Sequence, residues 1–184
     1  MKILTFTITL TFFLFGLSTD YLLAQKFRST SATVHFFSDA PVEDIEATNL
    51  DGQSAFDLSS GEIVFSIPIK SFTFEKSLMQ EHFNENYLES DKFPKAFFKG
   101  KITNYDLNQS EIQNASANGV ITIHGEEKEI STEGQIKISE KSIEISAKFP
   151  IKLEDFKIKI PKVVFYNIAE IVDVTITFNY EKID

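Results

Sequence analysis

Residues 142–153 read Ser-Ile-Glu-Ile-Ser-Ala-Lys-Phe-Pro-Ile-Lys-Leu, so apolar and polar side chains alternate at every step. Every odd position is apolar, and every even position holds a polar, charged or proline residue. Successive side chains of a β-strand point to opposite faces, so this pattern predicts a strand with one dry face and one wet face. The dry face comprises Ile143, Ile145, Ala147, Phe149, Ile151 and Leu153.

The same alternation occupies the neighbouring segments on both sides. Residues 129–138 and 172–181 each place apolar or small side chains on one face and polar side chains on the other. Strands of a buried parallel sheet would be apolar on both faces, so these segments indicate an antiparallel sheet. Their dry faces comprise Ile130, Thr132, Gly134, Ile136 and Ile138, and Val172, Val174, Ile176, Phe178 and Tyr180.

Earlier strands are less regular, and short turn-forming sequences separate them. A sheet of about eight strands with one wet face has to cover its dry face, and closure into a barrel also removes exposed edges. We therefore expect an all-β fold, a closed antiparallel barrel. The additional strands are predicted at 33–37, 44–49, 63–74, 96–105 and 118–124, with turns at Asp51-Gly52, Ser60-Gly61, Asn118-Gly119 and Gly125.

Residues 75–88 depart from the two-residue pattern. Met79, Phe83 and Tyr87 recur at every fourth position, which is typical of an amphipathic helix. Pro94 then prevents the helix from continuing into the next strand. In an otherwise all-β chain we expect this short helix to lie across the mouth or flank of the barrel as a lid.

The first residues have the features of a secretory signal peptide. Lys2 precedes an apolar run over 3–17, a polar break follows at 18–20, and we expect cleavage after Ala24. A membrane anchor is the alternative, but Asp20 interrupts the run before the ~20 residues that a spanning helix requires. The predicted organisation is a signal peptide at 1–24 and one barrel domain at 25–184, without an integral membrane segment after cleavage. The expected location is the periplasm or the medium.

Composition limits the classes of protein that this chain can represent. It has 184 residues, of which 42% are hydrophobic and 24% charged, as in a single globular domain. The net charge of −9 argues against nucleic acid as a partner, and against adhesion to an anionic membrane surface. The sequence contains no Cys, which excludes disulfide scaffolds, thiol enzymes, Cys-ligated zinc folds and Cys-anchored lipoproteins. Its 19 Phe residues indicate a large apolar interior.

No set of residues in the sequence indicates catalysis or metal binding. The three histidines, His35, His82 and His124, lie in different predicted segments. His82 and Glu85 have the spacing used in di-iron bundles, but such sites need matching pairs from other helices. Nucleophile motifs and phosphate-binding glycine loops are also missing. We therefore expect no catalytic residues, no metal and no cofactor, and we expect that the protein is not an enzyme.

One longer segment resembles a known family. Residues 78–100 read Leu-Met-Gln-Glu-His-Phe-Asn-Glu-Asn-Tyr-Leu-Glu-Ser-Asp-Lys-Phe-Pro-Lys-Ala-Phe-Phe-Lys-Gly, with Phe-Ser-Ile-Pro-Ile-Lys-Ser-Phe at 65–72 before them and Ile-Thr-Ile-His-Gly at 121–125 after them. This combination resembles the YceI-like family of exported bacterial proteins, in the form common among Bacteroidota. The resemblance implies an elongated lipocalin-like barrel whose interior tunnel holds a polyisoprenoid or similar lipid, with no catalytic residues and no metal.

The leading hypothesis is an exported, non-catalytic protein that sequesters or carries a long apolar lipid inside its barrel. The partner would be a polyisoprenoid or a prenyl quinone. The alternative is a filled barrel that acts as an envelope stress or interaction module without a ligand, and an enzyme on this barrel is a third, weaker candidate. A long apolar tunnel would favour the first hypothesis. Candidate lipid-binding residues, taken from strand parity and the lid, are Phe65, Ile67, Met79, Phe83, Ile121, Ile136, Ile145, Phe149, Val174, Ile176 and Phe178.

Overall fold

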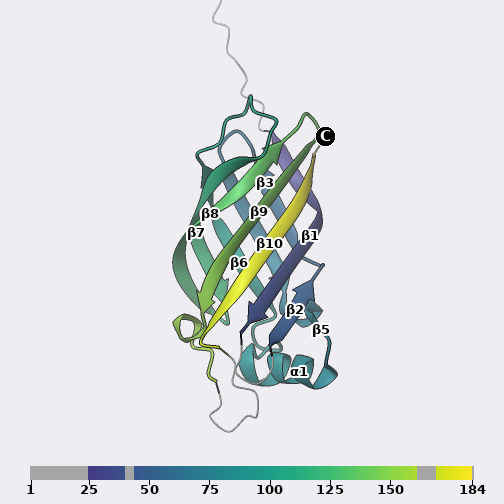
Figure 1. Cartoon of the computed structure of the whole chain (residues 1–184), viewed down its shortest axis with the longest axis vertical. Coiled ribbons are helices and arrows are strands. Elements are labelled where there is room, and N and C mark those ends of the chain that lie inside the picture. Colours follow the sequence, from purple (N-terminus) through teal and green to yellow (C-terminus); the bar gives the residue numbers. More distant parts are fainter. Residues whose placement is uncertain (1–24, 40–43, 161–168, 184) are drawn as a thin grey trace, which may run out of the picture.

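The computed structural model describes residues 25–39, 44–160 and 169–183 (Figure 1). The expected signal peptide at 1–24 lies outside these residues. The strands are β1 (Lys26–Ser38), β2 (Ile45–Asn49), β3 (Gln53–Asp57), β4 (Glu62–Pro68), β5 (Thr73–Phe74), β6 (Lys95–Thr103), β7 (Gln113–Ile123), β8 (Glu126–Ile138), β9 (Ser142–Lys152) and β10 (Ile171–Lys182). The helical segments are α1 (Ser77–His82), a π-helical turn (Phe83–Tyr87) and two 3₁₀ turns (Ile69–Ser71 and Leu153–Phe156).

Eight of the described strands form a closed antiparallel ring. The order around the ring is β1, β3, β4, β6, β7, β8, β9 and β10, and β10 pairs with β1 to complete it. The short strands β2 and β5 pair with each other, and β2 also pairs with the second half of β1. The expected closed barrel of about eight strands is confirmed.

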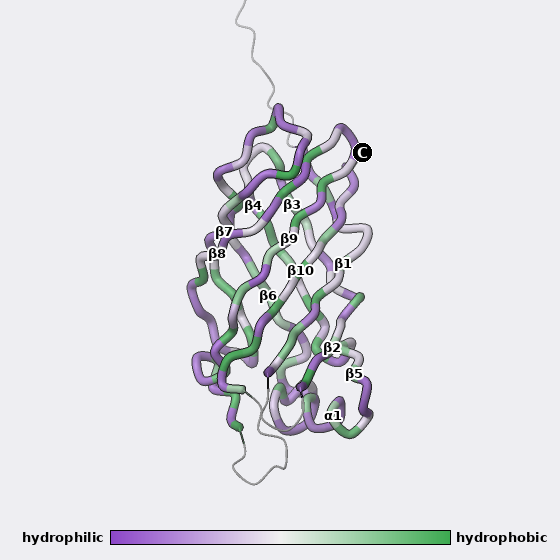
Figure 2. The backbone as a smooth tube through the Cα atoms, viewed as in Figure 1, coloured by the Kyte–Doolittle hydropathy of each residue, from purple (hydrophilic) through white to green (hydrophobic). Residues whose placement is uncertain are grey.

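Side-chain burial follows the alternation that the sequence predicts. Along β9, Ile143, Ile145, Phe149 and Ile151 are buried, whereas the even positions are exposed or half-buried. In β8 and β10 the buried side chains fall on the even positions, as the sequence predicts, and the backbone coloured by hydropathy alternates along the strands (Figure 2). The dry faces of the strands therefore point into the barrel and form one core.

The sequence did not indicate strand β3 (Gln53–Asp57), which lies between the predicted turns at 51–52 and 60–61. Its two inward positions are Ser54 and Phe56. Because Ser54 is polar, the segment lacks the alternation of apolar and polar residues that marks the other strands. Ser54 is nevertheless buried, and its hydroxyl donates a hydrogen bond to the carbonyl oxygen of Val64 at 2.8 Å. The polar residue at an inward position is therefore satisfied within the sheet.

The predicted single strand at 63–74 is interrupted. A 3₁₀ turn at Ile69–Ser71 separates β4 from β5, and the matching gap on the partner side separates β2 from β3. Asn49 is completely buried in this gap, where its Nδ2 donates to the carbonyl oxygen of Pro68 at 2.7 Å and its Oδ1 accepts from the amide of Asp51 at 2.9 Å. One side chain thus takes the place of main-chain hydrogen bonds across the interruption.

The predicted turn at Asn118-Gly119 was wrong, because both residues lie in the middle of β7. Gly119 is placed opposite Gly100 of β6. A Cβ atom on Gly119 would come 2.4 Å from the carbonyl oxygen of Lys99 and 2.8 Å from the Phe98 ring. The glycine here makes room for an inward aromatic ring instead of reversing the chain.

The turns at 60–61 and 124–125 are confirmed, and the second of them connects three segments at one end of the barrel. His124 adopts a positive φ of 53° in the β7–β8 turn, one residue beyond β7. Its Nε2 lies 2.8 Å from Oε2 of Glu89, and its Nδ1 lies 3.0 Å from the carbonyl oxygen of Phe156. Both partners are acceptors, so the ring satisfies both only when each nitrogen carries a proton.

The helical segment at 77–87 lies across the end of the barrel where β1, β4 and β9 finish (Figure 1). We call this the lid end. The segment falls within the predicted helix at 75–88, although its second half is a π-helical turn. In the part of the chain that the structure describes, no helix is both long and apolar enough to cross a membrane.

The opposite end of the barrel is closed by aromatic side chains. Tyr180 is completely buried and its hydroxyl lies 2.7 Å from Oγ of Ser54. Because the Ser54 hydroxyl donates to a backbone carbonyl, Tyr180 donates to Ser54. Burial raises the pKa of Tyr180 well above its usual range, and burial also raises the pKa of Tyr105, helped by the nearby charge of Asp57.

We predict that the protein loses stability at alkaline pH through these phenols. Below pH about 10 the folded and unfolded chains both keep the phenol protons, and above it the unfolded chain releases protons that the folded chain retains. The free energy of unfolding should therefore fall as the pH rises above about 10. Tyr180→Phe should flatten this fall while costing about 1 kcal/mol at neutral pH through the lost hydrogen bond. Urea unfolding at neutral and alkaline pH checks this, and an unchanged alkaline slope in the variant contradicts it.

We also predict energetic coupling between His124 and Glu89. His124→Ala should cost about 1–3 kcal/mol, because it removes the contacts of the ring nitrogens with Glu89 and with the carbonyl oxygen of Phe156. In a double-mutant cycle with Glu89→Ala, urea unfolding should give a coupling energy of about 1 kcal/mol, reduced by the partial exposure of Glu89. Additive single effects would show that this contact contributes nothing to holding the three segments together.

Candidate functional site

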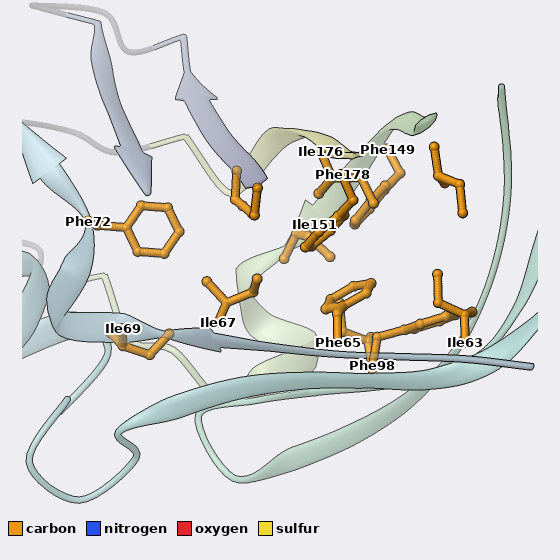
Figure 3. Packing of buried hydrophobic residues seen from close by; sticks show 14 of the residues in the cluster. Ile63, Phe65, Ile67, Ile69, Phe72, Phe98, Phe149, Ile151, Ile176 and Phe178 are labelled. Atoms are coloured by element: carbon orange, nitrogen blue, oxygen red, sulfur yellow. The ribbon is translucent and has the colours of Figure 1, made fainter. Parts of the chain in front are cut away.

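The barrel encloses a cavity of about 160 Å³ between the strand walls and the helical segment. We call it the main cavity. Nearly all of the side chains that line it are apolar, and they come from both the walls and the lid. In Figure 3 the side chains of the two facing walls point toward each other across the interior, with Phe72 and Ile69 toward one side and Ile63 toward the other. The apolar lining suits a hydrocarbon chain.

Most of the residues selected from the sequence meet at this cavity. Six come from the barrel wall and two from the helical segment. Selection by strand parity therefore identified side chains that are far apart in the sequence and meet in the fold. The eight that line the main cavity are Phe65, Ile67, Met79, Phe83, Ile121, Phe149, Val174 and Ile176.

The other three selected residues lie elsewhere. Ile136 and Ile145 line a second, smaller cavity of about 40 Å³, which we call the rear cavity. Phe178 lines neither cavity, because it is completely buried against its neighbours. Its ring centroid lies 5.5 Å from that of Phe65. Parity identified these residues as inward-facing, but it could not tell open space from filled core.

Phe83 connects the helical segment to the wall through a cluster of four aromatic rings. Its ring centroid lies 5.5 Å from Phe36, 5.4 Å from Phe72 and 5.0 Å from Phe74. Phe36 and Phe83 are stacked, with 17° between their ring planes. Helix α1 itself has no buried side chain, so Met79, Phe83 and the buried Tyr87 of the following turn supply apolar contacts of the lid with the barrel. Aromatic side chains therefore hold much of the lid against the barrel.

Sequence reasoning missed many other residues of the main cavity. Ile151 and Val172 share the parity of selected residues on the same strands, so this signal was present. Phe72 and Phe74 lie at even positions, whereas Phe65 and Ile67 lie at odd ones, because the intervening 3₁₀ turn reverses the inward parity. The missed apolar residues are Val34, Phe36, Ile45, Ile69, Phe72, Phe74, Tyr87, Leu88, Ala96, Ile123, Ile151, Leu153, Ile158 and Val172.

Only a few polar groups reach the main cavity within the described residues. They belong to Ser38, His82 and Tyr87. The Ser38 oxygen accepts a hydrogen bond from the amide of Ala169 at 3.0 Å. Burial raises the pKa of Tyr87, so its phenol stays protonated at neutral pH and can donate a hydrogen bond. This set can orient a polar head group near the lid, but the walls beyond it are hydrocarbon.

The described residues also contain no cluster of three or more His, Asp or Glu that could hold a metal ion. His82 ends α1, and Glu85 lies in the π-helical turn that follows it. The arrangement offers apolar surface and a small number of neutral hydrogen-bonding groups, which suits binding of an apolar molecule more than acid–base chemistry.

Solved structures with the same fold come from several bacteria. A polyisoprenoid-binding domain from Saccharophagus degradans, implicated in plant cell wall breakdown, aligns with a TM-score of 0.74 at 15% identity over 85% of this chain and 98% of that one. Burkholderia cenocepacia BcnA aligns with a TM-score of 0.65 at 15% identity over 80% and 95%. A YceI protein of Campylobacter jejuni aligns with a TM-score of 0.54 at 17% identity over 100% and 91%. At these identities the likeness concerns the fold.

The family assignment comes from the sequence itself. A search of curated proteins finds no match. The family description "YceI-like domain" matches residues 19–180, which is most of the chain. That the chain has the form common among Bacteroidota stays a prediction. The extent of the match, together with the closed barrel and its lid, means that the protein belongs to the YceI-like family.

Proposed function

We propose that this protein is an exported, non-catalytic binding protein that holds an apolar, polyisoprenoid-like lipid in its barrel. The main cavity carries this proposal. Protein interiors rarely leave voids larger than a water molecule, and a space of about 160 Å³ lined by apolar side chains is therefore unlike a filled core. This observation favours a lipid carrier over a barrel that acts without a ligand.

Burial of the hydrocarbon chain would supply the binding free energy, at ~25 cal/mol per Å² of apolar surface removed from water. The polyisoprenoid-binding domain of Saccharophagus degradans, which has the same fold, supports this class of ligand. A polar head would lie at the lid end, near His82 and Tyr87, where selectivity would be weak because so few polar groups are available. Phe65, Ile67, Ile121 and the other selected residues that line the main cavity would contact the chain.

Export is part of this proposal, and it rests on the signal-like residues 1–24. A protein in the periplasm or the medium could carry a lipid between sites that an apolar molecule does not reach through water. Cleavage after Ala24 would leave a mature chain that begins at Gln25.

The direct test is to purify the protein from the exported fraction, extract it with organic solvent and analyse the extract by mass spectrometry. We expect a prenyl lipid in the extract, and an intact protein mass that corresponds to a chain starting at Gln25. Lipid-stripped protein is the control, and prenyl quinones or prenyl phosphates should raise its melting temperature. Finding neither a lipid nor a thermal shift would contradict the proposal, and an uncleaved, membrane-bound chain would contradict export.

A second prediction concerns filling the main cavity with a side chain. Ala96 lines the cavity, so Ala96→Phe should place a ring where the lipid binds and weaken binding of a prenyl quinone on the order of tenfold or more. Ala55 on β3 is exposed, and Ala55→Phe is the matched control, which should bind as the unmodified protein does. Isothermal titration checks this prediction. Equal binding by both variants would show that the ligand binds outside the main cavity.

A further inference from the structure

Three stacked aromatic rings cross the interior of the barrel beside the main cavity. Phe98 of β6 and Phe65 of β4 are cross-strand partners, with ring centroids 5.0 Å apart and 21° between the ring planes. Phe65 also stacks on Phe178 of β10, at 5.5 Å and 27°. We call Phe98, Phe65 and Phe178 the aromatic barrier. Figure 3 shows Phe65 and Phe98 on one wall and Phe178 on the facing wall.

The two cavities lie on different sides of this barrier. The main cavity touches Phe65 but neither Phe98 nor Phe178, whereas the rear cavity touches Phe65 and Phe98. Besides Phe65, three side chains line both cavities, and they complete the constriction between them: Ile121, Phe149 and Ile176. Among the described residues, the apolar space of the barrel is therefore narrowed at Phe65 into two cavities.

The backbone is adapted to hold the barrier in place. A Cβ atom on Gly100 would come 2.5 Å from the Phe98 ring, and one on the facing Gly119 would come 2.8 Å from the same ring. Beyond Phe178 the aromatic contacts continue to Tyr180, whose ring centroid is 6.1 Å away. The rings are thus supported from behind by buried side chains, and Phe65 cannot swing toward the far end without displacing them.

Small side chains create the rear cavity. Ala115, Ala117, Gly134 and Ala147 line it, together with Thr132. The space behind the barrier is therefore apolar and could accept further hydrocarbon if the constriction were opened. In the unmodified protein Phe65 separates it from the lid side.

We infer that Phe65 and the aromatic barrier set the length of lipid chain that this protein accommodates. This inference rests on the proposed function. A chain that enters from the lid end stops at Phe65, and any additional isoprene units remain outside the barrel. Phe65 is thus a specificity-determining residue, and the rear cavity remains unused. The ligand class is a single prenyl chain whose buried part is short.

The test is a length series of prenyl alcohols, measured by isothermal titration on the purified exported protein after lipid removal. The series comprises geraniol, farnesol, geranylgeraniol and a long polyprenol. Affinity should rise with length and then reach a plateau within the series, because units beyond the barrier stay in water. Affinity that rises with every added unit would overturn the inference. This measurement uses the unmodified protein, so its result does not depend on whether any variant folds.

Variants then test which residue limits the length of the bound chain. Phe65→Leu should join the two cavities and move the plateau to a longer chain, with a gain on the order of tenfold for that chain, as expected from burying two more methylene groups. Phe56→Leu is the matched control, because Phe56 is also a buried phenylalanine but lines neither cavity. It should leave the plateau unchanged. A plateau that does not move in Phe65→Leu would overturn the inference.

A third variant tests whether the gain uses the rear cavity. Ala117→Leu alone should bind the series as the unmodified protein does, because Ala117 lines only the rear cavity. Combined with Phe65→Leu, it should abolish the gain in chain length, and a gain that persists would overturn the assignment of the rear cavity. Binding of no prenyl alcohol at all would overturn the proposed function itself, and this outcome is distinct from binding without a length limit.

Discussion

Because β10 pairs with β1 along most of both strands, the sheet closes and its apolar face becomes an interior. In the register of this pairing Ala32, Val34 and Phe36 lie opposite Phe178, Ile176 and Val174, so inward side chains of one strand meet inward side chains of the other. A shift by one residue would turn one strand's apolar set to solvent. Everything inside the barrel, including its cavities, therefore depends on the agreement of inward parity between the first and last strands.

Closure alone would produce either a filled or a hollow barrel, and the choice depends on side-chain size. Around the aromatic barrier, rings are packed until no ligand-sized space remains. Toward the lid, branched aliphatic side chains leave an opening of about 160 Å³, and small residues on β7, β8 and β9 leave another of about 40 Å³. The same alternation of apolar and polar residues thus produces both filled and hollow regions inside one barrel.

The sequence allowed the fold class and the parity of β8, β9 and β10 to be predicted, because apolar and polar side chains alternate regularly along these strands. It failed where polar or small residues face inward for local reasons. Ser54 concealed β3, and Gly119 suggested a turn although it accommodates the Phe98 ring. Most of the selected residues line the main cavity, but which inward side chains border a void depends on packing between distant strands. Strand parity alone does not predict that packing.

The interruption between β4 and β5 has a further consequence for how the chain can vary. Its 3₁₀ turn resembles an ordinary connection, yet it sets Phe72 and Phe74 on the inner face after a change from odd to even positions. Deleting or inserting one residue there would rotate these rings outward and remove two of the three partners of Phe83. The number of residues at 69–72 is consequently constrained, and relatives that keep this aromatic lid should tolerate substitutions at the exposed Lys70 and half-buried Ser71 but not changes in length.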